Sequence, residues 1–294
     1  MTRLHIPAIV DLLLVDDAAT ISAVADDRRL DRAYAPNGPL INRIVTSRIR
    51  KDLQLAGVPF PPVAPRGAQR PVPAQAALEA RLDPLAPQLA QGGPSLKTLA
   101  DYVRGVGADE DAGPLSQQAV GRLFDPAYEA DAASWAAAKT LDAAPRSFNP
   151  FQLIWWALTG AVPKARALLA AKVGGDPSGT HGTGVAVHNI VAGFQQMRRL
   201  WADERARTQL SPEAAAAQCL VAPQQVVRQP TAAGMSAAGE FAATTLVMLQ
   251  LNKAHAADPN AETAFMAASW ARCPAHAWVP ALLAGAWRAA QSEG

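Results

Sequence analysis

The spacing of apolar and polar residues along the chain predicts many short helices and little β-structure. Alanine, the strongest helix former, is abundant, and 24 prolines and 20 glycines interrupt the apolar pattern. An apolar run over residues 9–15 predicts an early strand. Asp17 then predicts the N-cap of a helix over residues 18–26, with Ile21 and Val24 on one face.

The second half of the chain shows stronger apolar patterns. Residues 151–159 and 163–173 predict two buried helices, the second of which ends at Gly174 and Gly175. A glycine-rich segment then leads into a long helix that continues through Trp201. The abundance of helix signals favours a mainly helical fold.

Two further patterns complete the predicted elements. Ser211 followed by proline predicts an N-cap and a helix that continues to about Val221. Residues 244–251 are β-branched and apolar, which is typical of a strand. The predicted fold class is therefore mainly α with a little β-sheet.

Two stretches predict soft connections between elements. Residues 58–73 contain six prolines, which predicts an extended connection and no helix, and residues 105–113 are acidic and contain glycine. Neither stretch is long enough to separate two folding units, and no repeat is present. We therefore predict a single helical domain over residues 1–294.

Composition narrows the classes of partner. With 27 basic and 25 acidic residues the net charge is +2, which predicts neither a nucleic-acid partner nor a membrane partner. The N-terminal apolar run is too short to span a bilayer and has no signal-peptide cleavage site. Two cysteines do not form a disulfide framework, so we expect a reducing, cytoplasmic location.

Several kinds of catalytic site are not supported by the motifs. The acidic residues between Asp16 and Asp31 have no second metal-binding motif, and the arginines beside them favour a salt-bridged helix end. The chain contains no Gly-x-Ser-x-Gly elbow, and Gly182-Thr183-Gly184 is too short for a dinucleotide-binding loop.

The histidines have no zinc-ligand spacing. His181 and His188 are seven residues apart, and no carboxylate completes a metal site beside them. His181 lies in the glycine-rich segment that precedes the long helix. It is either a capping or core histidine, or a residue that lines a ligand pocket and moves protons.

Cys273 lies in a more distinctive setting. Arg272 precedes it, and Pro274 follows it at what we predict to be the first position of the C-terminal helix. Backbone N–H groups at the start of that helix would stabilise a thiolate, which is a strong axial ligand for heme iron. The alternative is a buried free cysteine, and this is the interpretation that we favour for Cys219.

The sequence around Cys273 resembles the cysteine loop of the heme-thiolate, cytochrome P-450 superfamily. Phe265, Arg272 and the Cys273-Pro274 pair match that loop, while Ala275 stands in place of the usual glycine. Residues 12–30 are similar to the early strand and helix of bacterial members.

Two further segments can be compared with those of the superfamily. Gln225-Val-Val-Arg228 occupies the place of the superfamily's helical Glu-x-x-Arg pair, with glutamine for glutamate. The long helix near His181 would lie over the heme. It lacks the superfamily's acid–threonine pair and offers His181 and Thr183 instead, which are the residues that the resemblance suggests for proton handling.

The resemblance implies a compact heme-thiolate-like fold, with heme b as cofactor and Cys273 as the iron ligand. Phe265, Arg228, Arg272 and His276 would contact the heme or brace the loop. The implied activity is that of an oxidoreductase, a monooxygenase or peroxygenase, acting on a small or lipophilic substrate with a redox partner or as a homo-oligomer. The alternative is a heme-free helical protein that binds a partner or a ligand.

Overall fold

The computed structural model describes residues 1–32, 34–52, 54–55, 58–59, 71–147, 149–270 and 272–292. Within these ranges the chain forms two compact units, each made of two separate segments of sequence. The first unit comprises Met1–Glu79 and Val221–His276, and the second comprises Ala80–Leu220 and Ala277–Gly294. The greater part of the predicted 58–73 connection lies outside the described residues.

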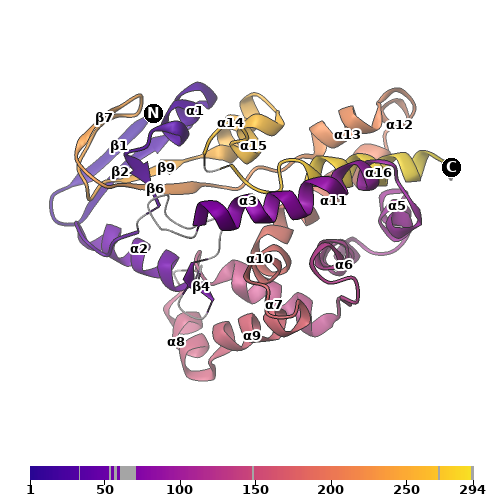
Figure 1. Ribbon diagram of the computed structural model, residues 1–294, viewed down its shortest axis with the longest axis horizontal. Coiled ribbons are helices and arrows are strands. Elements are labelled where there is room, and N and C mark those ends of the chain that lie inside the picture. The colour runs from indigo at the N-terminus through magenta and orange to yellow at the C-terminus, as the bar shows by residue number, and fades with distance from the viewer. Residues whose placement is uncertain are drawn as a thin grey trace. The chain divides into compact units, whose positions relative to one another are not determined.

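The first unit contains a five-stranded sheet (Figure 1). Its strands, in spatial order, are β1 (Thr2–Ile6), β2 (Val10–Val15), β9 (Leu246–Leu249), β6 (Val226–Pro230) and β3 (Leu30–Asp31). Strands β2 and β9 pair in parallel, and the other neighbours pair antiparallel. The predicted strands at 9–15 and 244–251 are thus confirmed in their central residues.

The remaining elements of the first unit surround this sheet or extend from it. They are α1 (Ala18–Asp26), α2 (Leu40–Asp52), α3 (Pro71–Leu82), α14 (Leu251–Ala257), α15 (Ala261–Phe265) and the hairpins β4–β5 (Gln54–Leu55, Val58–Pro59) and β7–β8 (Gly234–Ser236, Gly239–Phe241). The α1 helix forms as predicted. The Asp17 carboxylate accepts a 2.8 Å hydrogen bond from the Thr20 N–H, and Ile21 and Val24 are buried.

The second unit is helical. Its helices are α4 (Ala86–Ala90), α5 (Lys97–Val103), α6 (Ala112–Phe124), α7 (Ala132–Ala143), α8 (Pro150–Thr159), α9 (Ala161–Lys172), α10 (Pro177–His181), α11 (Val187–Trp201), α12 (Glu204–Gln209), α13 (Pro212–Cys219) and α16 (Trp278–Ser292), with short 3-10 turns at Asp83–Leu85, Pro94–Leu96 and Asp109–Asp111. The predicted Ser211 cap is confirmed, because its hydroxyl accepts from the Ala214 N–H at 3.1 Å.

The C-terminal helix α16 forms much of the core of this unit. It packs against α4, α5 and α13, and α13 lies alongside it in Figure 1. Trp287 is fully buried and meets Trp201 of α11 edge-on, with ring centroids 5.0 Å apart. Burying two indoles in this way contributes a large apolar area to the core.

Three sequence-based expectations need correction. Residues 71–73 belong to α3, because proline is tolerated in the first turn of a helix. The α8 helix exists as predicted but is not buried, and its apolar side chains are largely exposed. The C-terminal helix begins at Trp278, so Pro274 is in the turn before it. Among the described residues, none of the helices has the length and apolarity needed to cross a membrane.

Candidate functional site

Cys273 closes a tight loop in the first unit. The loop begins where α15 ends at Phe265, and Met266 turns the chain with a left-handed backbone (φ 50°) that non-glycine residues rarely adopt. The Cys273 N–H then donates a 2.8 Å hydrogen bond to the Phe265 carbonyl. We call residues 266–273 the cysteine loop. Phe265 and Cys273, eight residues apart in sequence, are thereby held together.

The Cys273 sulfur is a thiol in this environment. Burial raises its pKa, the Ala275 N–H that bonds to the sulfur lowers it, and the nearby Glu79 carboxylate raises it further. The expectation that the start of a helix stabilises a thiolate is wrong, because α16 starts five residues later. A metal ion that bound this sulfur would displace its proton.

Arg272 and His276 brace the cysteine loop. The Arg272 Nε and Nη2 donate to the Glu79 carboxylate at 2.9 and 2.5 Å, and this bidentate pair holds the pKa of Glu79 below its usual value. Gln75 donates to the Arg272 carbonyl at 3.1 Å. The His276 Nδ1 lies 3.1 Å from the Cys273 carbonyl oxygen. Two buried side chains of α3 therefore support the loop.

Arg228 lies on strand β6, not on a helix as the comparison with a Glu-x-x-Arg pair implied. Gln225 precedes the strand and is exposed, whereas Arg228 is fully buried, so the two do not form the expected pair. The Arg228 guanidinium donates to the Val227 carbonyl at 3.2 Å and to the Met266 sulfur at 3.7 Å. Its contact with Met266 places Arg228 beside the cysteine loop.

A second buried cation lies close to Arg228. Arg32 is only 4% exposed, and its guanidinium carbon is 5.0 Å from the centre of the Trp270 ring, which Arg228 approaches at 6.0 Å. Burial, together with the charge of Arg228, lowers the pKa of Arg32 to about 10. Burial also lowers the pKa of Arg228. We call Arg32, Arg228 and Trp270 the arginine cluster.

The arginine cluster has an excess of positive charge. Asp31 is the buried carboxylate that interacts with both guanidinium groups, and burial raises the pKa of the neighbouring Tyr34, which keeps its phenol neutral. In the part of the chain that the structure describes, the Arg228 Nε has no hydrogen-bond partner. A buried donor without a partner is costly, and a carboxylate would satisfy it with a charge-assisted bond. Heme carries two carboxylates, so the cluster fits that cofactor.

The second unit contains the other two predicted site residues. His181 ends α10 and precedes a π-helical turn (Gly182–Ala186) that leads into α11. Burial lowers the pKa of His181 to about 4, so the imidazole is neutral at pH 7. Thr183 is fully buried, and its hydroxyl donates to the Gly179 carbonyl at 2.8 Å. Cys273 belongs to the first unit.

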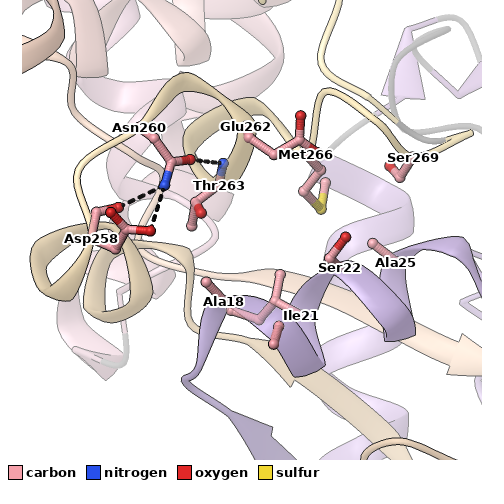
Figure 2. A pocket seen from close by; sticks show the side chains of 11 residues that line it. Ala18, Ile21, Ser22, Ala25, Asp258, Asn260, Glu262, Thr263, Met266 and Ser269 are labelled. Carbon is pink, nitrogen blue, oxygen red and sulfur yellow. Dashed lines mark hydrogen bonds between the residues drawn. The ribbon is translucent and has the colours of Figure 1, made fainter.

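A cavity of about 270 Å³ lies between α1 and the α14–α15 region of the first unit (Figure 2). Ile21, Ala25 and Met266 give it an apolar wall, and Asp258 and Glu262 are among its polar lining residues. Drug-sized ligands occupy pockets of roughly 300–1,000 Å³. The cavity is therefore at the lower limit of pockets that hold small ligands. Met266 connects it to the arginine cluster through the Arg228 contact.

Sequence reasoning missed Arg32, Glu79 and Trp270. Glu79 is 193 positions from its partner Arg272, and no local pattern links them. Arg32 follows an acidic run that pointed only to surface ion pairs, of which the Arg29–Asp27 pair at 2.7 Å is one. Among the described residues, no three His, Cys, Asp or Glu side chains gather as a metal site.

Comparisons with known proteins show which known fold the chain resembles. No family model matches the chain, and no curated protein matches it. Among solved structures, the cytochrome P-450 enzyme CxnD for C–S bond formation in chuangxinmycin biosynthesis matches with a TM-score of 0.59 and 14% identity, over 96% of this chain and 79% of that one.

Two further solved structures agree with that match. A cytochrome P-450 from Thermus thermophilus has a TM-score of 0.59 at 13% identity, over 98% of this chain and 83% of its own. Cytochrome P-450-153 from Novosphingobium aromaticivorans has a TM-score of 0.53 at 13% identity, over 95% and 82%. The chain thus has a divergent cytochrome P-450-like fold, mainly helical with a small sheet, as the sequence predicted.

Proposed function

We propose that this chain binds heme b through Cys273 and acts as an oxidoreductase of the monooxygenase or peroxygenase kind. The observation that carries the proposal is the arginine cluster. The unit that holds Cys273 also holds two buried guanidinium groups, one with an Nε that has no partner among the described residues. A cysteine and a carboxylate-binding cluster in one unit of a P-450-like fold are what a heme-thiolate protein requires.

The loop residues have distinct proposed roles. Cys273 supplies the axial sulfur, and Arg228 and Arg32 bind the cofactor's carboxylates. Arg272, His276 and Phe265 hold the loop through their contacts with Glu79, the Cys273 carbonyl and the Cys273 N–H. When bound, a thiolate-ligated heme supplies redox chemistry in which electron donation from sulfur favours O–O cleavage.

His181 and Thr183 are the proposed proton-handling residues. With a pKa of about 4, His181 is neutral at pH 7, so its imidazole can accept a proton but does not store one. Thr183 donates its hydroxyl to the Gly179 carbonyl. A π-helical turn at this point is a feature often found at functional sites.

We propose that the substrate is small or lipophilic. The absence of an acid–threonine pair favours an oxidant such as peroxide, which brings its own protons, over dioxygen with a redox partner. The proposed protein partner is a redox partner or a second copy of this chain.

The test uses matched cysteine substitutions and heme spectroscopy. Purified protein expressed with ample heme is expected to show a strongly red-shifted Soret band in its ferrous-CO form. Cys273→Ala should abolish that band. Cys219→Ala should preserve it, because Cys219 is fully buried in α13 and burial raises its pKa to about 12.

Two results would contradict the proposal. If Cys273→Ala keeps the shifted band, another residue is the ligand. If the wild-type chain, correctly folded by circular dichroism, takes up no heme, the heme-free alternative holds. Peroxide-dependent turnover of a generic lipophilic substrate then separates an enzyme from a heme carrier.

A further inference from the structure

The α8 helix of the second unit exposes an unusual number of large apolar side chains. Phe151, Ile154, Trp155 and Leu158 are 82, 57, 65 and 80% exposed. Their spacing of three and four residues puts them on one side of the helix, which we call the apolar face of α8. Contiguous exposed apolar patches of this kind mark interaction sites.

The α8 helix and the α9 helix that follows it carry charges of one sign only. Neither α8 nor the adjoining α9 contains an acidic residue, and α9 carries Lys164, Arg166 and Lys172. Lys172 is paired with Asp131, whereas Lys164 lies exposed one turn beyond the end of α8. An apolar helix face with tryptophan and phenylalanine, followed by an exposed lysine, is complementary to a membrane surface that contains anionic lipids.

We propose that α8 docks on the surface of an anionic lipid bilayer. Its ten residues extend about 15 Å, half of the hydrocarbon thickness, so it would lie in the interface and not cross it. A second copy of this chain is a poorer occupant, because it would bring two basic α9 helices together with no carboxylate between them. The proposal departs from the sequence-based expectation of no membrane partner and does not depend on heme.

The test is co-sedimentation of the full chain with lipid vesicles. Wild-type protein should bind vesicles of phosphatidylcholine with phosphatidylglycerol, bind vesicles of phosphatidylcholine alone much less, and dissociate as salt rises. Replacing two exposed side chains, Phe151→Ser with Leu158→Ser, should weaken binding at least about tenfold. Lys164→Glu should weaken it about fivefold or more.

The matched control is Val106→Ser. Val106 is 61% exposed on another part of the same unit, and its replacement should leave vesicle binding unchanged. The proposal is wrong if wild-type protein does not bind anionic vesicles, or if the double variant binds as well as wild type. It is also wrong if the wild type is a dimer that the double variant converts to a monomer, with no vesicle binding by either.

Discussion

The cysteine loop in the first unit and the α10–α11 segment in the second both bury polar side chains, but they differ in charge. Beside the loop, two guanidinium groups are buried, and the Arg228 Nε has no partner among the described residues. In the α10–α11 segment, His181 is held neutral and the Thr183 hydroxyl is bonded to its own helix.

This difference separates two requirements of the proposed function. A buried cation that lacks a hydrogen-bond acceptor is destabilising, and a bound anion would supply that acceptor. The arginine cluster is therefore suited to bind an anion. The Thr183 hydroxyl, by contrast, already has an acceptor in the Gly179 carbonyl, and His181 carries no charge at pH 7 that an anion would neutralise. In the proposed function, the residues that hold the cofactor and those that move protons lie in different units, so substitutions in one unit should leave the role of the other intact.

The largest expected effect concerns the neutrality of His181. Its folded pKa of about 4 lies below the unfolded value of 6.5, so above pH 6.5 neither state binds a proton and the full stability is present. Between pH 6.5 and 4 only the unfolded chain is protonated, and the free energy of unfolding should fall by about 3 kcal/mol. The free energy of unfolding of the His181→Gln variant should not show this decrease.

Urea unfolding of wild type and His181→Gln at pH 7, 5.5 and 4.5 measures the difference. Using the two proteins together cancels the contributions of other groups, including His188, whose pKa burial also lowers. Parallel pH dependence in the two proteins would show that the pKa of His181 is not lowered by folding, and the contrast between the two regions would then disappear.

The next effect concerns the arginine cluster. Arg228→Met should weaken hemin binding about tenfold to a hundredfold, since it removes a charged hydrogen-bond donor. The heme-free variant should unfold with a free energy equal to or above that of wild type, because a methionine replaces a buried cation. Arg228→Lys, which keeps the charge and loses the planar fork, should give intermediate affinity.

Hemin titration followed by Soret absorbance, and urea unfolding of the heme-free proteins, measure these two quantities. Unchanged hemin affinity together with a large loss of stability would show that Arg228 is a structural cation. The cluster would then not be an anion site, and the two regions would be alike in needing no ligand.

Local patterns predicted the elements whose signals lie within a few residues. The Asp17 and Ser211 caps act over two or three positions, and both are found where the sequence indicates. By contrast, Cys273 was predicted to lie directly before the C-terminal helix, which instead begins five residues later, at Trp278. Arg228 was assigned to a helix although Val226 and Val227, two β-branched residues, precede it and favour the strand that forms.

Other features could not be predicted because they depend on distant segments. The Glu79–Arg272 pair forms between residues 193 positions apart. Arg32 comes near Arg228 because β3, which ends at Asp31, pairs with β6. The apolar composition of α8 predicted a buried helix, and its burial was predicted wrongly. It could not indicate that other parts of the chain leave that helix exposed.

The smallest expected effect concerns Glu79, which pairs with Arg272 of the cysteine loop and whose charge raises the pKa of Cys273. Glu79→Gln should lower the free energy of unfolding by about 1 kcal/mol at pH 7, a modest loss because Arg272 is 43% exposed and solvent screens the pair. The folded pKa of Glu79 is lowered, so this stabilisation is present above the unfolded value of 4.5 and is lost as the pH falls through the folded value.

The same substitution should lower the pKa of the Cys273 thiol, because the Glu79 charge raises it. The rate of alkylation against pH, in a Cys219→Ala background, measures that pKa. Glu240→Gln, which removes an exposed carboxylate from the β7–β8 hairpin of the same unit, should leave it unchanged. A thiol pKa that stays constant or rises in Glu79→Gln would mean that the brace fixes the position of the loop without affecting its sulfur.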